Sequence, residues 1–220
     1  MCDKIAELKD NKETIKLFVA GGIPYYRKLM YYYKYNMEKW KAVFNEFYNI
    51  RGLKKENRSR FFKLFDKKIK ELKSPTFDDQ SLKTFLVTFL EETKTEVTRK
   101  NGQTITRYNL SFVSKLLHTY APEKFIIYDK HVLSFFGKRN LTGAENKAAL
   151  YFKLKKEYDN NQEIKGIADF FKCFGDISDI STYKKIDFMI WGYGRWKEFE
   201  KKYPSKEQPE IRIGKKRSAE

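Results

Sequence analysis

One lysine and one aspartate stand out in the stretch SFVSKLLHTYAPEKFIIYDKHV, residues 111–132. Lys115 lies in a segment of helical periodicity, and Asp129 follows an apolar run at the expected start of another helix. A neutral amine can attack a carbon atom and form a Schiff base, and a carboxylate can stabilise positive charge. The pair therefore allows nucleophilic chemistry if the fold brings it together. The simpler interpretation is a solvated lysine and an aspartate that only caps a helix.

The segment that carries Lys115 has two chemically different sides. One side of the expected helix is apolar and holds Phe112, Val113, Leu116, Leu117 and Tyr120. Ser111, Lys115 and His118, spaced by four and then three, occupy the opposite side. We expect Ala121 and Pro122 to end this helix, residues 125–128 to be buried, and Asp129 to cap the next helix. The helix should bury its apolar side and display Lys115 on the other.

Overall charge points to a polyanionic partner. The 220 residues contain 46 Lys and Arg against 29 Asp and Glu, which gives a formal net charge of +17. Nucleic acid is the first candidate. No apolar run is long enough to span a membrane, so we expect a cytoplasmic protein. Two cysteines and two histidines exclude a Cys-rich zinc site or a four-cysteine iron–sulfur cluster, and we predict no metal site.

Helical periodicity covers most of the chain, and 17% aromatic residues can supply a core. We predict a mainly α fold with one β-hairpin near residues 95–108 and a single helical domain over 1–204. Two lobes, 1–94 and 109–204, would flank a cleft, and a mobile basic tail would follow at 205–220. We expect a monomer. The expected helices cover residues 3–20, 25–50, 60–73, 76–90, 111–120, 145–158, 164–174 and 182–203.

The aromatic segment from Tyr25 to Ile50 permits two interpretations. Tyrosines that alternate with basic residues are typical of a base-stacking surface. Steps of three and four instead indicate one apolar stripe of a long helix, made of Met30, Tyr33, Met37, Trp40, Phe44 and Phe47. We therefore assign the stripe to the core and leave Tyr31, Tyr32 and Tyr35 as surface contacts.

The segment TEVTRKNGQTITRY predicts a β-hairpin, because β-branched residues alternate on both sides of Asn101-Gly102. A type I′ turn at that pair would set Glu96 opposite Arg107 and Arg99 opposite Thr104. We predict that Arg99, Lys100 and Arg107 contact DNA phosphates. The alternative is a solvated ornament at the edge of the fold.

The motif Tyr128-Asp129-Lys130-His131-Val132, placed after Ser114-Lys115-Leu116-Leu117, resembles the helix-hairpin-helix DNA glycosylases. In that superfamily a lysine-bearing helix precedes an apolar run and an aspartate, often within Val-Asp-x-His-Val. The resemblance is nearest to the 8-oxoguanine glycosylase and endonuclease III branch, whose lysine is nucleophilic. It covers residues 109–136. The family's Gly-x-Gly before the lysine is absent here, and Asn109, Ser111 and Ser114 stand in that place.

The resemblance implies a DNA glycosylase, with lyase activity as an option, that removes a damaged base or a hypermodified base of phage DNA. Lys115 and Asp129 would be catalytic, and no cofactor is needed. Side-chain donors for phosphate would be Asn109, Ser111 and Ser114, with His118 and His131 as further DNA contacts or as structural residues. The target base would flip out of double-stranded DNA into a pocket. Candidates for its lining are Trp191, Tyr193 and Trp196, with core packing as the alternative.

Two other functions remain open on the residues alone. One is a nucleic-acid-binding module that keeps the fold without the chemistry, in which Lys115 and Asp129 would matter little. The other is a metal-dependent nuclease built around the hairpin, which chelation by EDTA would inactivate. The stretch Glu96-Val97-Thr98 lacks the Glu-x-Lys arrangement common in such nucleases, so this alternative ranks last.

Overall fold

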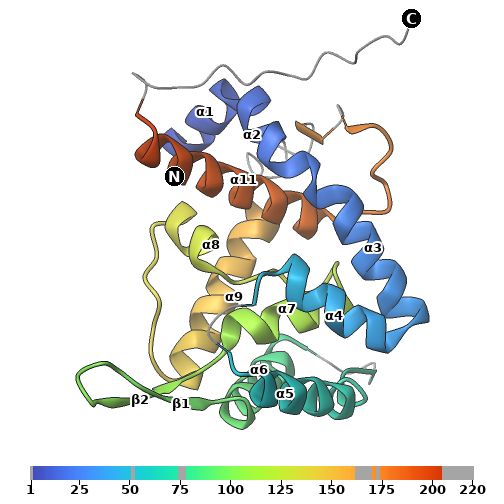
Figure 1. Cartoon of the computed structure of the whole chain (residues 1–220), viewed down its shortest axis with the longest axis vertical. Coiled ribbons are helices and arrows are strands. Elements are labelled where there is room, and N and C mark those ends of the chain that lie inside the picture. Colours follow the sequence, from blue (N-terminus) through green and yellow to red (C-terminus); the bar gives the residue numbers. More distant parts are fainter. Residues whose placement is uncertain (1, 51–52, 74–77, 162–169, 172–173, 205–220) are drawn as a thin grey trace, which may run out of the picture.

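The computed structural model describes residues 2–50, 53–73, 78–161, 170–171 and 174–204. The chain order of its elements is α1 (Cys2–Asp10), α2 (Lys12–Ala20), α3 (Gly22–Tyr35), α4 (Met37–Phe47), α5 (Lys55–Lys68), the 3₁₀ turn η1 (Glu71–Lys73), α6 (Asp79–Glu92), β1 (Thr95–Thr98), β2 (Thr104–Arg107), α7 (Leu110–Tyr120), α8 (Lys130–Phe135), α9 (Ala144–Asn160) and α11 (Thr182–Lys202) (Figure 1). The predicted mainly α fold with one hairpin is confirmed. Most of the expected helix at 164–174, the start expected at Thr76 and the tail at 205–220 lie outside the described residues.

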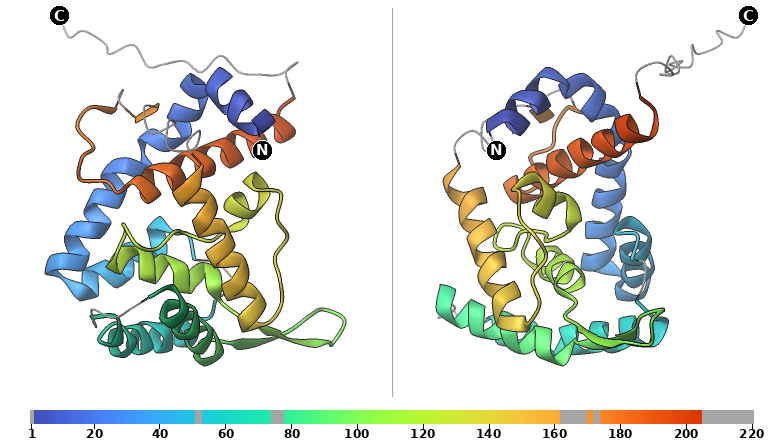
Figure 2. Two further views of the ribbon diagram at one scale, coloured as in Figure 1. Left: turned by 180° about the vertical axis from the view of Figure 1, so that it is seen from behind. Right: turned by 90° about the vertical axis from the view of Figure 1, so that its left-hand side faces the viewer.

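The helices form successive levels (Figures 1 and 2). Helices α1, α2 and α11 lie at one end, α5, α6 and the hairpin at the other, and α7, α8 and α9 between them. Helix α11 packs on α2 and on α8, and α6 packs on α9. Two of these pairs, α11 with α2 and α6 with α9, join residues before the hairpin to residues after it. The two predicted lobes are therefore in contact with each other. One continuous hydrophobic core runs through the described helices.

Two glycines of α11 allow close approach of neighbouring elements. A methyl group at Gly192 would lie 2.7 Å from Val19 Cγ2, on α2. A methyl group at Gly194 would lie 2.1 Å from His131 Nδ1, at the start of α8. Real side chains cannot approach that closely, so both positions require glycine for the observed packing. Helix α11 is thereby held against the elements that carry the residues described below.

Two long helices expected from the sequence are each divided. The helix expected over 3–20 is interrupted at Asn11, and α3 begins at Gly22 with Pro24 in its first turn. Proline is tolerated there because the first turn has no intrahelical partner for its missing N–H. The helix expected over 25–50 breaks at Asn36, whose side chain accepts a hydrogen bond from Lys39 N and caps α4.

That break also divides the aromatic stripe. Trp40 and Phe44 are fully buried, as predicted, and Met30, Tyr33 and Phe47 pack against the core. Met37 is 38% exposed, because it is the first residue of α4 and lies outside the continuous helical face that the stripe assumed. Tyr31 and Tyr35 are exposed, in agreement with their assignment to the surface, and Tyr32 is half-buried.

The hairpin forms with a register one residue away from the predicted one. Thr95 pairs with Arg107, and Thr98 pairs with Thr104. Gly102 N donates to Arg99 O at 2.9 Å, and Arg99 N donates to Gln103 O at 2.8 Å. Of the turn residues only Gly102 has a positive φ, +80°. A type I′ turn needs positive φ at two positions, so the chain adopts a three-residue loop with a glycine bulge.

Candidate active site

Helix α7 is buried on all sides, which corrects the expectation that it displays Lys115. All of its residues except Ser111 and Tyr120 are buried, and Lys115 is only 7% exposed. The side that carries Lys115 and His118 is covered by the aromatic rings of α3 and of the residue that follows α4. Lys115 Nζ lies 5.7 Å from the centroid of the Tyr48 ring, and Tyr26 contacts His118. The polar side chains of Lys115 and His118 on α7 are thus enclosed in the protein interior.

Lys115 has a short list of neighbours. Its Nζ donates a hydrogen bond to Ser111 Oγ, one turn earlier, at 2.7 Å. Burial lowers the pKa of the Lys115 amine below its usual value, and the Lys184 charge lowers it further. The carboxylates of Asp129 and Asp187 act in the opposite direction, with Asp129 the stronger of the two. The net effect makes the neutral, nucleophilic form of Lys115 more accessible than for a surface lysine.

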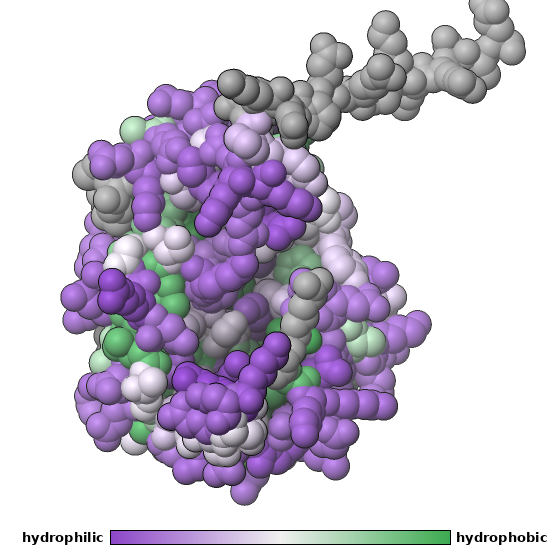
Figure 3. All heavy atoms as spheres, turned by 60° about the vertical axis from the view of Figure 1, so that its left-hand side comes forward, coloured by the Kyte–Doolittle hydropathy of each residue, from purple (hydrophilic) through white to green (hydrophobic). Residues whose placement is uncertain are grey.

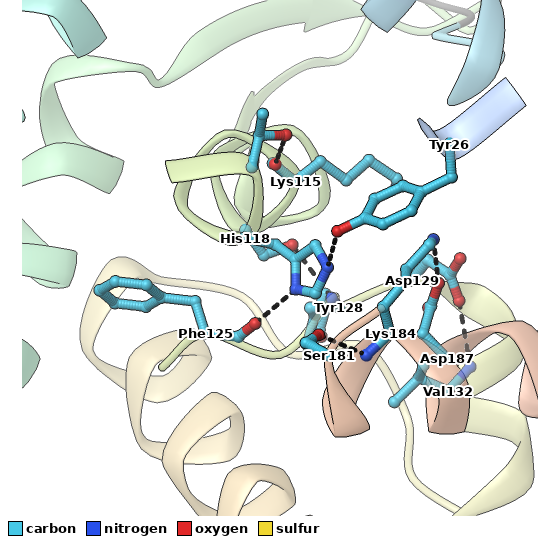
Figure 4. A network of polar contacts seen from close by, with 12 residues as sticks. Tyr26, Lys115, His118, Phe125, Tyr128, Asp129, Val132, Ser181, Lys184 and Asp187 are labelled. Carbon is cyan, nitrogen blue, oxygen red and sulfur yellow. Dashed lines mark hydrogen bonds and ion pairs between the residues drawn. The ribbon is translucent and has the colours of Figure 1, made fainter. Parts of the chain in front are cut away.

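Asp129 caps α8, as the sequence predicts. Its backbone is extended, and Oδ1 accepts hydrogen bonds from His131 N at 2.9 Å and Val132 N at 3.1 Å. The side chain is half-buried. The apolar run 125–128 that precedes it is buried, and Tyr128 N donates to Ser114 Oγ at 3.0 Å. This bond fastens the run to α7 and so holds Asp129 in the electrostatic neighbourhood of Lys115 (Figure 4).

A second lysine and aspartate, which sequence reasoning missed, complete the site. Lys184 Nζ and Asp187 Oδ2 on α11 form an ion pair at 2.6 Å, with the two residues only 2% and 4% exposed. Lys184 Nζ also lies between 4.3 and 5.4 Å from four ring centroids, those of Tyr26, Phe47, Tyr48 and Phe188. Burial raises the pKa of Asp187 despite its partner. We call Lys115, Asp129, Lys184 and Asp187 the Lys115 cluster (Figure 4).

A weak signal for this pair exists in the sequence. Lys184 and Asp187 are spaced by three, the separation of helical neighbours, next to the apolar residues Ile186, Met189 and Ile190. Such a pair is most often solvated, so spacing alone does not indicate burial. Phe188 lies on the same helix, but the other three rings that enclose the pair come from α3, α4 and the residue after α4, far away in the sequence.

Two tyrosine hydroxyls near the cluster lack partners. The hydroxyl groups of Tyr48 and Tyr158 are buried, and neither has a hydrogen-bond partner with acceptable geometry among the described residues. Thr119 Oγ1, which donates to Lys115 O at 2.9 Å, lies near Tyr48, but the two hydroxyl groups are not in hydrogen-bonding geometry. Asp187 and Asp129 add to burial in raising the pKa of Tyr158, which places its hydroxyl within their electrostatic reach. Orphan hydroxyls of this kind can accept a polar atom of a ligand or an ordered water.

His118 lies in the interior beside the cluster. Its Nδ1 lies 2.7 Å from Phe125 O, and Nε2 lies 3.3 Å from the Tyr26 hydroxyl (Figure 4). Burial lowers the pKa of His118 to about 3, so the ring is neutral, with Nδ1–H donating to the carbonyl. His131 is also buried, and its ring packs against Gly194. Neither position favours the predicted DNA contact, because both rings are used inside the protein.

The residues in the place of the family's glycines are also used internally. Asn109 Nδ2 donates to Thr93 O at 2.6 Å and thereby ties the end of α6 to the start of α7. Ser114 is fully buried, and Ser111 accepts the hydrogen bond from Lys115. These bonds do not favour the predicted phosphate contacts of Asn109 and Ser114. Ser111 is half-buried and lies beside the amine.

The basic residues of the hairpin lie at the protein surface, where a DNA phosphate could reach them. Arg99, Lys100 and Arg107 are exposed. Arg99 Nη1 donates to Gln103 Oε1 at 3.3 Å across the hairpin loop. Hydrophilic side chains cover most of the face shown in Figure 3, with small hydrophobic areas between them. The structure thus leaves the hairpin's cations at the surface, while the Lys115 cluster is enclosed.

The three base-pocket candidates on α11 are separated by the structure. Tyr193 and Trp196 are buried and pack on each other, with ring centroids 5.8 Å apart, and the Tyr193 hydroxyl donates to Glu7 Oε2 at 2.5 Å. Their contacts agree with the core-packing alternative. Trp191 is half-buried, and Arg195 lies 6.0 Å from its ring. Trp191 follows Asp187 by one helical turn, so it lies on the side of α11 that bears the cluster.

Within the described part of the chain, we also searched for a metal site and for a membrane-spanning helix. No group of three or more His, Cys, Asp or Glu side chains is placed there to hold a metal ion. None of the helices in the described ranges is both long and apolar enough to cross a bilayer. Comparison of the chain with known protein families, curated proteins and solved structures finds no match.

Proposed function

We propose that the protein is a DNA glycosylase that uses Lys115 as its nucleophile and can nick the DNA strand afterwards. The observation that carries the proposal is the buried Lys115 amine, whose pKa is lowered by burial and on which the Asp129 carboxylate acts more strongly than that of Asp187. A nucleophilic lysine must be neutral when it attacks, and desolvation is the usual way to reach that state near neutral pH. The resemblance of residues 109–136 to the lysine-dependent glycosylases supports the same reaction.

The proposed reaction follows from the two side chains. The Lys115 Nζ lone pair attacks C1′ of the target deoxyribose, the C1′–N bond to the base breaks, and the base leaves with the electron pair and takes up a proton. Loss of a proton from nitrogen and opening of the sugar ring give a Schiff base. Removal of a C2′ proton then expels the 3′ phosphate, and water releases Lys115. The Asp129 carboxylate stabilises the positive charge that develops on the sugar.

The arrangement also indicates what must move. Lys115 is almost fully enclosed and bonded to Ser111, whereas Asp129 is half-buried. A flipped nucleotide would therefore enter from the side of Asp129 and displace the Ser111 bond. The Tyr48 ring lies against the Lys115 amine, and its hydroxyl, which has no hydrogen-bond partner among the described residues, offers a polar contact for the substrate. The net charge of +17 and the exposed hairpin cations supply attraction to the duplex backbone. The excised base would be a damaged base or a hypermodified base of phage DNA.

Borohydride trapping on duplex DNA with an abasic site tests this proposal. Borohydride reduces the Schiff base to a stable amine, so the wild-type protein should become covalently joined to DNA. Lys115→Arg keeps the charge but cannot form the adduct, and Lys63→Arg, at an exposed position of α5, is the matched control. An adduct that persists in Lys115→Arg would contradict the assignment. Strand nicking on the same DNA should be lost with the adduct.

One observation favours a second function, a DNA-binding module without chemistry. Lys115, Lys184 and Asp187 are buried, and Lys184 pairs with Asp187, as in a purely structural arrangement. Such a module would bind DNA in a salt-sensitive way and form no adduct, and Lys115→Arg would leave its affinity unchanged. For the metal-dependent nuclease, no described residue cluster offers support, and nicking that resists EDTA would exclude it.

A further inference from the structure

A third buried lysine, Lys147, lies outside the Lys115 cluster, and none of the described residues gives it a carboxylate partner. Lys147 on α9 is 6% exposed, and its Nζ donates to Asn140 Oδ1 at 2.8 Å. No carboxylate is within ion-pair distance of Lys147 among the described residues, whereas Lys155 on the same helix pairs with Asp159. An amide oxygen is a neutral acceptor and does not compensate a buried positive charge. The charge of Lys147 is therefore unbalanced in this structure.

The surroundings add positive potential at this position. Lys147 is the fourth residue of α9, so it lies at the positive end of the helix dipole. Burial and the charge of Arg107, on β2, both lower the pKa of Lys147. Glu145 in the same helical turn is exposed. A cation is normally avoided at such a place, and an anion is what the local field favours.

The hydrogen bonds define a place for an anionic oxygen. The Tyr128 hydroxyl donates to the same atom, Asn140 Oδ1, at 3.0 Å. Burial raises the pKa of Tyr128 to about 12, so this hydroxyl remains a donor at neutral pH. Two donors, one of them charged, thus converge on one oxygen atom. Asn140 itself is exposed, so its amide can leave and uncover both donors.

A basic hollow lies beside these residues. It measures about 370 Å³ and borders α9 next to Lys147, with Asn146 and Leu150 among its lining. Three of its lining residues are cations, Lys138, Arg139 and Lys153, and none is acidic. We define Lys147, Tyr128 and Asn140 as the Lys147 cluster. The hollow is lined by neighbours of this cluster in the sequence, and its three cations add positive charge beside it.

We propose that the Lys147 cluster binds a backbone phosphate of the DNA, which displaces the Asn140 amide and accepts hydrogen bonds from Lys147 and Tyr128. The inference rests on the proposed function, because it takes DNA as the partner. Tyr128 directly precedes Asp129, so the anchored phosphate lies next to the strand segment presented to the Lys115 cluster. Arg107 extends the same track toward the hairpin.

The test is the salt dependence of DNA binding. Affinity for a duplex with a reduced abasic site is measured by fluorescence anisotropy between 50 and 200 mM salt, for wild type, Lys147→Met and Lys156→Met. Lys156 is exposed on the same helix and controls for the loss of one positive charge. Loss of one phosphate contact should lower the slope of log K against log salt by about 0.9 and weaken binding roughly tenfold. Lys156→Met should keep the wild-type slope.

Equal slopes for Lys147→Met and wild type would overturn the proposal. A second arm measures the thermal stabilisation of each protein by inorganic phosphate. If Lys147→Met loses that stabilisation but binds DNA normally, the site takes free phosphate and the DNA assignment fails. Failure of the Lys147 proposal can be distinguished from failure of the proposed function. If the wild-type protein forms the Lys115 adduct and Lys147→Met keeps the wild-type salt slope, only the Lys147 site is rejected. The absence of DNA binding by the wild-type protein would reject both.

Discussion

The protein buries lysines in two different ways. In the Lys115 cluster, Lys184 pairs with Asp187 and Lys115 lies within reach of Asp129, so positive and negative groups are balanced inside the fold. In the Lys147 cluster, the acceptor that the described residues provide for a buried ammonium is a neutral amide. Tyr128 links the two regions, because its backbone N–H donates to Ser114 Oγ on α7 and its hydroxyl donates to Asn140 Oδ1 beside Lys147. The two regions differ because Lys147, unlike Lys184, has no carboxylate partner among the described residues.

A buried cation has different energetic consequences in the two regions. A balanced cluster is expected to be costly to break, because removing one partner leaves the other charge buried. An unbalanced cation carries an electrostatic cost in the folded state, and a ligand of opposite charge can relieve it. Mutations that remove single charges should therefore have opposite effects on stability in the two regions.

The largest effect is expected at Lys184. Lys184→Met leaves Asp187 buried without its partner, which should lower the free energy of unfolding by about 3–5 kcal/mol at pH 7 in urea titrations. The double variant Lys184→Met/Asp187→Leu removes both charges and should recover most of that loss. A single variant as stable as the wild type would show that the ion pair is not a balanced unit.

A smaller effect is expected from His118 on acidification. Its folded pKa of about 3 lies below the unfolded value near 6.5, so the unfolded state binds the proton first and stability falls as pH drops between these values. The loss should reach about 2 kcal/mol at pH 5. It is measured as the difference between wild type and His118→Gln, since His131, whose pKa burial also lowers, is present in both. Parallel stability curves for the two proteins would contradict the buried neutral ring.

Asp129 should show a moderate effect through its cap. Asp129→Ala removes the acceptor for His131 N and Val132 N and should cost about 1 kcal/mol of stability, whereas Asp129→Asn keeps an acceptor and should cost less. Thermal unfolding distinguishes them. Because Asp129 raises the pKa of Lys115, Asp129→Asn should also move the Lys115 pKa downward, which pH-dependent reductive methylation can follow. An unchanged Lys115 pKa would show that the Asp129 charge does not act on the amine.

The smallest effect on stability is expected at Lys147. Lys147→Met removes an uncompensated buried charge and leaves no carboxylate behind, so the melting temperature should be unchanged or slightly higher. Differential scanning calorimetry in a buffer without phosphate gives the measurement. A loss comparable to that of Lys184→Met would erase the difference between the two regions.

Local signals explain which features could be predicted from the sequence. The cap at Asp129, the end of α7 at Ala121 and the buried run 125–128 depend on a few adjacent residues, and they were predicted correctly. Asn36 is a residue type that often caps helices, but the continuous aromatic stripe favoured one long helix over a break at this position. The hairpin was predicted from Asn101-Gly102, yet its register depended on the φ angle of one residue.

Tertiary burial explains what the sequence could not predict. The helical wheel placed Lys115 on an outer side of α7, and only the packing of Tyr26 and Tyr48 against that side encloses it. Lys184 and Lys147 look like two of many surface lysines until their neighbours are known. Which lysine lies beside a carboxylate, and which does not, depends on contacts between helices distant in the chain.

The most direct test of the central claim is to identify which lysine carries the sugar. The protein is trapped with borohydride on DNA containing an abasic site, digested, and mapped by mass spectrometry. If Lys115 is the nucleophile, the reduced adduct should lie on the peptide that contains Lys115, and on no other lysine at comparable yield. An adduct located on Lys184, on Lys147 or spread over exposed lysines would contradict Lys115 as the nucleophile.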